Sequence, residues 1–235
     1  MLQRCKIYVN TEKVLKMIKF GAPSIALQGR ETLAGVGQPI ELHNVTFDDF
    51  NFKPEPGYVY AVSRAISSRV NANYDGWPVD QIKQSYKTFV GRPIYVEHNN
   101  SDPDRARGVI LDAVYRESKL ASGATDGSVY CLMEVDAQSF PKLANSIMEG
   151  SLNAVSMGAD VDCTQCSACG KVASKPAEYC THIPRLKGRT VTVYKAGKRI
   201  ESLVFESCIR PNFFELSFVF EPADESAWLL QKKRY

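Results

Sequence analysis

The sequence predicts an α+β domain that is rich in antiparallel strands and carries a small metal-binding insert. Most apolar residues fall in short runs with strand-like alternation, bounded by Gly, Pro, Asn and Asp. Only a few segments place apolar residues at the helical spacings of three and four. Four of the seven cysteines lie between residues 163 and 182, a clustering that indicates metal ligands in a reducing compartment.

The strand predictions rest on β-branched and aromatic residues between turn signals. In chain order they cover residues 4–9, 57–66, 92–98, 106–116, 128–136, 153–161 and 212–222. A Gly- and Ser-rich loop joins two of them into a hairpin, and the segment 189–207 predicts a second hairpin around its Lys-Ala-Gly turn. Residues 22–57 contain many Gly, Pro and polar positions and predict mostly irregular chain.

Three segments predict helices, at residues 10–21, 77–91 and 139–150. The last has the most complete signals. Ser139 is its expected cap, Pro141 lies in its first turn, and Gly150 ends it. Few helices among many strands, without regular alternation, favour an α+β domain over a parallel α/β fold.

Composition narrows the class of protein. With 235 residues and 44% hydrophobic content, the chain can bury a full core, and we expect one main domain over 1–235. A net charge of +3 does not by itself indicate a nucleic-acid partner. No apolar run reaches the roughly 18 residues of a membrane helix. The first residues lack the apolar core of a signal peptide, so a cytosolic protein is expected.

The cysteine segment predicts a zinc site. Cys166 and Cys169 form a Cys-x-x-Cys turn that Gly170 follows, and this turn lets two sulfurs face one ion. Cys180 and His182 come later and complete a tetrahedral set. Zinc prefers such soft or borderline ligands, whereas unrelated free thiols do not require this spacing.

A fifth candidate ligand, Cys163, is expected to be spare because four ligands fill a tetrahedron. We place the insert at residues 160–190 and expect its zinc to be structural, since four protein ligands leave no open position for water. Nucleic-acid binding is not expected, because acidic residues offset the basic ones in this segment. The residues weighed are Lys171, Lys175, Arg185, Lys187 and Arg189 against Asp160, Asp162 and Glu178.

Two polar residues stand out as candidates for catalysis. His98 ends a strand and runs into a turn of Asn, Ser and Asp residues. Ser156 lies in an apolar strand with Gly158 two positions later, which leaves room for a close approach of backbone. Taken alone, each is more commonly a packing or solvated residue, and His43 is expected to be structural.

Three stretches together resemble the tailed-phage prohead proteases, the capsid maturation serine proteases that share a fold with herpesvirus assemblin. They are "TFVGRPIYVEHNNSDPDRARGVILDAVYR", "FPKLANSIMEGSLNAVSMGADV" and "FFELSFVFEPADESA", in the family's order. The resemblance covers roughly residues 88–227. Some members also carry a Cys-x-x-Cys…Cys-x-His insert after the serine strand, as this chain does.

The resemblance implies a serine endopeptidase. Ser156 would be the nucleophile and His98 the general base. Glu215, in the Glu-x-Ser core of the third stretch, would orient the imidazole. Asp112, on the strand after the histidine turn, is the rival for that role. The oxyanion donors are left open.

The resemblance also implies a setting. The core would be barrel-like and flanked by helices, and the substrates would be scaffold and major capsid precursor proteins, cut in the host cytoplasm inside an immature prohead. A homodimer is compatible with the family. No membrane contact and no nucleic-acid partner are expected. The alternative is a non-catalytic, zinc-stabilised virion protein with a protease-like fold.

Overall fold

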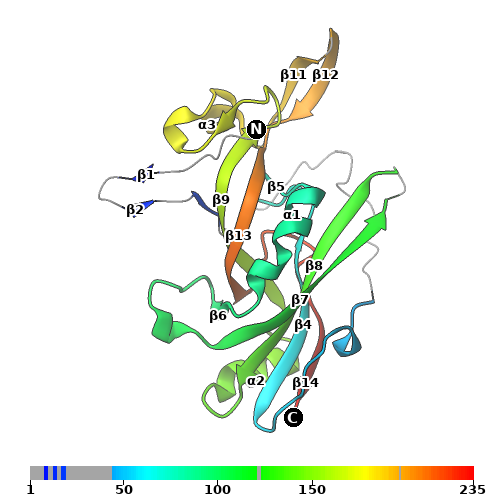
Figure 1. Ribbon diagram of the computed structural model, residues 1–235, viewed down its shortest axis with the longest axis vertical. Helices are drawn as coiled ribbons and strands as arrows, with labels where there is room; N and C mark the ends of the chain where they lie inside the picture. Colours follow the sequence, from blue (N-terminus) through cyan, green and yellow to red (C-terminus); the bar gives the residue numbers. More distant parts are fainter. Residues whose placement is uncertain (1–7, 10–12, 15–16, 20–43, 121–122, 196) are drawn as a thin grey trace.

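The computed structural model describes residues 8–9, 13–14, 17–19, 44–120, 123–195 and 197–235. In this part of the chain the strands form one sheet of ten strands and two sheets of two strands. Figure 1 shows an elongated molecule in which the large sheet forms the body and a small knob with a two-stranded arm forms one end. No described helix is both long and apolar enough to span a lipid bilayer.

The elements have the following bounds. The strands are β1 (Tyr8–Val9), β2 (Lys13–Val14), β3 (Met17–Lys19), β4 (Tyr58–Ser67), β5 (Asp75–Gly76), β6 (Pro93–Val96), β7 (Gly108–Lys119), β8 (Thr125–Asp136), β9 (Ala154–Cys166), β10 (Val172–Ala173), β11 (Thr190–Lys195), β12 (Lys198–Leu203), β13 (Glu206–Val219) and β14 (Leu229–Arg234). The helices are α1 (Val79–Ser85), α2 (Pro141–Glu149) and α3 (His182–Leu186), with the 3-10 turns η1 (Phe47–Asp49), η2 (Tyr86–Phe89), η3 (Pro103–Arg105) and η4 (Pro176–Glu178).

The large sheet runs in the order β10-β9-β13-β6-β7-β8-β4-β14, with β3 on β9 and β5 on β13. Most pairs are antiparallel, as the sequence predicts, but β13 is parallel to both β6 and β5. Because parallel neighbours need a crossover, β13 pairs with strands that lie far earlier in the chain. This mixed centre places β6, β13 and β9 side by side.

The sheet is open, so the expected barrel-like core is wrong. At one end the sheet nearly meets itself, where an isolated bridge joins Ala154 to Trp228 and the Val155 N–H donates to the Ala227 carbonyl over 2.9 Å. Directly after Trp228, β14 turns to pair with β4. These contacts, with the hydrogen bond of 2.8 Å from the Leu229 N–H to the Asn153 carbonyl, join the start of β9 to the start of β14 without closing a barrel.

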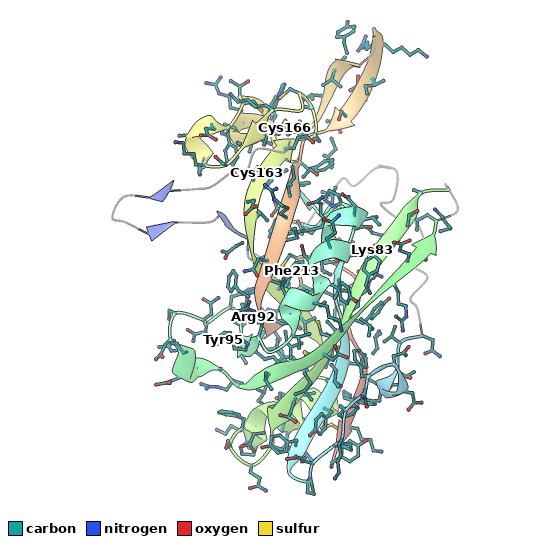
Figure 2. The ribbon with its side chains drawn as sticks, in the orientation of Figure 1. Lys83, Arg92, Tyr95, Cys163, Cys166 and Phe213 are labelled. Atoms are coloured by element: carbon teal, nitrogen blue, oxygen red, sulfur yellow. The ribbon has the colours of Figure 1, made fainter. Side chains whose placement is uncertain are left out.

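The main core packs α1, η2 and α2 against the sheet. Trp77, Phe89 and Phe213 are fully buried, and the Phe89 and Phe213 rings stack with centroids 4.2 Å apart. Figure 2 labels Phe213 under α1, midway along β13. This aromatic layer fixes β13 from one side, which matters because β13 carries Glu215.

Several predicted elements differ from the structure. The helix over 10–21 is wrong where the chain is described, because Met17–Lys19 pairs with β9 as a strand. Sheet pairing has there overridden a helix-like spacing of apolar residues. Ser139 does not cap α2; its hydroxyl donates to Asp136 instead. The strand β14 was missed because its sequence, Leu-Leu-Gln-Lys-Lys-Arg, carries a strongly polar end.

Candidate functional site

His98 lies in a strained turn after β6. Glu97 and His98 both have positive φ angles, 51° and 52°, which non-glycine residues rarely adopt. The Glu97 N–H donates to the Phe218 carbonyl on β13 over 2.9 Å, and the Asn99 N–H donates to the Val96 carbonyl over 3.1 Å. Such backbone costs about 1–3 kcal/mol per residue and persists where surrounding contacts enforce it. Here it turns the imidazole back towards β13.

Glu215 receives that imidazole. Its carboxylate is fully buried on β13, and Oε1 lies 2.7 Å from His98 Nδ1. The other oxygen, Oε2, accepts a hydrogen bond of 2.7 Å from the Ser217 hydroxyl. A carboxylate acceptor at Nδ1 selects the tautomer that carries its proton there, which leaves Nε2 of a neutral ring as a proton acceptor. This is the state that a general base requires.

Gly158 makes the position of Glu215 possible. A Cβ atom at residue 158 would lie 2.6 Å from Glu215 Oε1 and 2.9 Å from Phe214 Cε2, closer than real Cβ atoms approach other groups. The sequence suggested that the missing side chain leaves room for substrate backbone. In the structure, the room above Gly158 is occupied by the Glu215 carboxylate.

Ser156 lies on the same face of β9, two residues before Gly158. In the antiparallel pairing of β9 with β13, Ser156 is the partner of Ser217 and Gly158 is the partner of Glu215. Directly paired residues share one face of a sheet, and residues two apart along a strand lie about 7 Å from each other. The nucleophile candidate is thus one strand step from the residue that holds Glu215, and its side chain is 5% exposed.

Tyr95 on β6 lies in line with Ser217 on β13 and Ser156 on β9. It is the β6 partner of Ser217 in the parallel pairing of β6 with β13. Burial raises the pKa of the Tyr95 hydroxyl, and the charges of Glu215 and Asp102 raise it further. A neutral, buried phenol therefore borders the carboxylate, in a place that the sequence did not single out.

Asp112, the rival third residue, has other partners. Its Oδ1 accepts from Lys87 Nζ over 2.7 Å and from its neighbour's N–H, that of Ala113, over 2.7 Å. The structure therefore brings Glu215 and not Asp112 to His98 Nδ1. The expected structural residue His43 lies outside the described residues.

A small hollow borders Ser156 on the side of β9 that faces away from β13. Its walls include Ala65, Ile66 and Trp77 from the body and Ala223 and Ala227 from the loop before β14. The lining is mostly apolar, with side chains that are small on the loop side. Asn71, Asp75 and Asp224 also line it, and its volume of about 10 Å³ leaves room for roughly one water molecule.

The predicted metal ligands meet at the other end of β9. Ligand atoms of Cys166, Cys169, Cys180 and His182 all lie within 4.8 Å of one another. Cys166 ends β9, Cys169 lies in the following turn, and Cys180 and His182 lie at the start of α3. The Gly170 N–H donates to the Cys166 carbonyl over 2.8 Å, which closes the turn. These four residues could hold a metal ion.

Cys163 is not part of the cluster, in agreement with its expected role as a spare cysteine. It is buried on β9, where it pairs with Ile209 of β13. Figure 2 shows Cys163 and Cys166 close together along this strand. Because two residues of an extended strand separate them, only Cys166 reaches the turn that carries the other ligands.

The donor set fits a metal ion chemically. Burial alone would raise the pKa of the Cys180 thiol, but the Ile183 N–H and the neighbouring Cys169, Cys166 and His182 outweigh it and lower this pKa to about 6. Cys180 is then a thiolate, the ligand form, near neutral pH. In addition, His182 Nδ1 is buried and makes no hydrogen bond to any described residue. The cluster thus offers a thiolate and a buried nitrogen that require a partner.

In comparisons with known proteins, no protein-family model, no curated protein and no solved structure matches the chain.

Proposed function

We propose that the protein is a serine endopeptidase in which Ser156, His98 and Glu215 act together. The observation that carries this proposal is the buried Glu215 carboxylate, bound to His98 Nδ1 over 2.7 Å beside the strand that bears Ser156. Burying a carboxylate is costly unless its oxygens are hydrogen-bonded. A site that holds one against a histidine in a strained turn is typical of catalytic centres.

In the proposed reaction, Ser156 Oγ attacks the carbonyl carbon of a peptide bond while His98 Nε2 takes the hydroxyl proton. The imidazolium then donates this proton to the leaving amine, and an acyl-enzyme ester remains on Ser156. Water, deprotonated by the same nitrogen, hydrolyses the ester and restores the hydroxyl. Glu215 stays ionised throughout, fixes the tautomer and stabilises the imidazolium.

The resemblance to prohead proteases supplies the substrate class of the proposal. Scaffold and major capsid precursor proteins would be cut inside an immature phage head. The substrate class is supported by the resemblance, whereas the catalytic roles are supported by the contacts of Glu215.

We also propose that the metal is a structural zinc ion. Three sulfurs and one imidazole complete a tetrahedron, and no position remains for a reactive water. Cys166 lies ten residues from Ser156 along β9, which is about 33 Å of extended strand. A zinc ion at this distance has no direct part in the cleavage.

One observation favours the alternative, a non-catalytic virion protein with a protease-like fold. Ser156 is only 5% exposed, so a substrate reaches it only if the neighbouring loop moves away. The two functions differ in one outcome, since the structural protein cuts no peptide bond.

The test incubates the purified protein with scaffold and capsid precursors of its own virus, and with a library of natural peptides, and identifies fragments by mass spectrometry. We expect defined cuts that the Ser156→Ala variant does not make, while its fold and metal content stay unchanged. The same cuts by Ser156→Ala would refute the nucleophile, and no cuts by the wild-type protein would favour the structural alternative.

A further inference from the structure

The positive charge of the chain is concentrated in one segment. Residues 167–203 contain eight Lys or Arg and two Glu, a net charge of +6, whereas the whole chain has a net charge of +3. The rest of the molecule is therefore net negative. The two thiolate ligands within this segment, Cys169 and Cys180, and a divalent ion together leave its net charge unchanged. An asymmetry of this size indicates a partner of opposite sign.

The structure gathers this segment at one end of the molecule. The metal cluster, α3 and the β11–β12 hairpin form the knob and arm at the end opposite the C-terminus (Figure 1). β11 and β12 pair only with each other among the described strands. Val191 and Val193 pack on the small core of the knob, around Cys166 and Ile183, which holds the base of the hairpin. The hairpin is thus a supported, projecting β-ribbon.

The acidic residues near this segment offset only part of its charge. Asp162 lies on β9 and binds Arg210, which is outside the segment, over 2.6 Å. Glu178 accepts hydrogen bonds from the N–H and hydroxyl of Ser174 and pairs with Lys175 over 3.6 Å. Lys187 is also committed, since it binds the buried Asp75 and Glu206. The expectation against nucleic acid set Asp162 against the basic residues of the segment, but the partner of Asp162 lies elsewhere.

Several basic side chains on the knob and ribbon remain available. Among the residues that the structure describes, Lys171, Arg185, Arg189 and Lys198 form no ion pair. Arg199 at the tip pairs with the exposed Glu201 over 3.8 Å and donates to the Thr192 hydroxyl over 3.5 Å. Beside them Tyr194 is 75% exposed. We call these five residues of the knob and ribbon, Lys171, Arg185, Arg189, Lys198 and Arg199, the basic tip.

We propose that the basic tip binds the phosphate backbone of double-stranded DNA, with the β11–β12 ribbon lying along a groove. The major groove of B-DNA admits a two-stranded β-ribbon. Arg and Lys side chains on such a ribbon reach the flanking phosphates, and Arg can bind two oxygens at once. An acidic polypeptide would match the charge but not the shape of a projecting ribbon. This activity is independent of the proposed peptide-bond cleavage.

The test measures binding of the full-length, metal-loaded protein to a fluorescent 20-base-pair duplex by anisotropy, over a series of salt concentrations. With about four to five phosphate contacts, the slope of log affinity against log salt should be about −4. The Arg189→Glu, Lys198→Glu double variant should bind at least tenfold more weakly. The Lys53→Glu, Lys142→Glu variant, which changes net charge equally at exposed sites on the body, should bind within about twofold of wild type.

Three results would overturn the proposal. One is the absence of duplex binding at low salt, and another is an equal loss of affinity in both double variants, which would show a response to net charge alone. The third is a polyglutamate chain of matched charge that competes as well as the duplex does, which would assign the basic tip to an acidic protein. Cleavage by Ser156 is measured separately, so its failure and this one are distinguishable.

Discussion

The two candidate centres lie at opposite ends of β9 and are built in opposite ways. The metal cluster comes from a compact segment, Cys166 to His182, whose turn and short helix bring the ligands together. The proposed catalytic residues Ser156, His98 and Glu215, named here the Ser156 cluster, lie on β9, in the turn after β6 and on β13, and His98 and Glu215 are 117 positions apart in the chain. Figure 2 shows the separation, with Cys166 at the knob and Tyr95 at the far end of β13.

This difference shows which part of the fold determines the side-chain positions in each centre. Local spacing is sufficient to gather metal ligands, because a Cys-x-x-Cys turn positions two sulfurs without help from the rest of the fold. The Ser156 cluster needs the register of β6, β13 and β9, in which Ser217 is the partner of both Tyr95 and Ser156. Loss of the metal should therefore lower the stability of the fold more than the rate of cleavage. Small changes on β13 should lower the rate of cleavage more than the stability.

The sharpest contrast comes from the two acids that compete for the third catalytic role. Glu215→Gln keeps the shape but removes the charge that orients and stabilises the imidazole. We expect the rate of peptide cleavage to fall by about 10³-fold or more, as for loss of the acid in other triads. The matched change Asp112→Asn should leave the rate within about threefold, measured as kcat/KM. The reverse ranking would move the third role to Asp112.

Gly158→Ala probes the same carboxylate from the facing strand. The added Cβ would lie 2.6 Å from Glu215 Oε1, so the carboxylate must move away from His98. We expect cleavage to fall by about 100-fold and the free energy of unfolding to drop by about 1–3 kcal/mol, as for other overpacked sites. Peptide cleavage and urea unfolding measure the two effects. Wild-type activity in this variant would mean that the position of Glu215 does not matter for the reaction.

Removal of the metal should lower the stability of the fold while leaving the rate of cleavage nearly unchanged. Cys169→Ser breaks the cluster, and we expect a loss of stability of about 3 kcal/mol, which lowers Tm by roughly 6–12 °C. Cleavage per folded molecule should change by less than about threefold. Cys163→Ala is the control and should keep the full metal content, as measured by elemental analysis. A folded but inactive Cys169→Ser protein would instead assign the metal to catalysis.

The smallest effect is expected for Ser217→Ala. The Ser217 hydroxyl donates to Glu215 Oε2, and its loss leaves that oxygen buried without this donor. We expect a fall in kcat of about tenfold with little change in KM, because the residue positions the carboxylate and does not touch substrate. Ser217→Thr, which keeps a hydroxyl, should recover part of the rate. An equal loss in both variants would point to packing as the cause.

The sequence predicted the four residues of the metal cluster and the contact between His98 and Glu215 for different reasons. Spacing alone was enough for Cys166, Cys169, Cys180 and His182, because their geometry is local. The choice between Glu215 and Asp112 needed the fold, since both lie within strands, β13 and β7, and only the packing of these strands shows which carboxylate meets His98. Gly158 and Ser217 carry a signal in hindsight, because residues two apart on a strand share a face.

Other features could not be read from the sequence because pairing partners lie far apart in it. The parallel pairing of β13 with β6 and the pairing of β3 with β9 depend on contacts between distant segments. The open edge of the sheet likewise depends on the turn after Trp228, which sends β14 to β4. In each case tertiary contact decides between local alternatives of similar propensity.

The central claim is that Ser156 is activated by His98 and Glu215, and a fluorophosphonate probe tests it most directly because it needs no known substrate. The probe phosphonylates an activated serine, and mass spectrometry locates the label. We predict labelling at Ser156 in the wild-type and Cys169→Ser proteins, and a loss of at least 100-fold in labelling rate in His98→Ala. Equal labelling with and without the imidazole, or no labelling of Ser156 in the folded wild-type protein, would contradict the account.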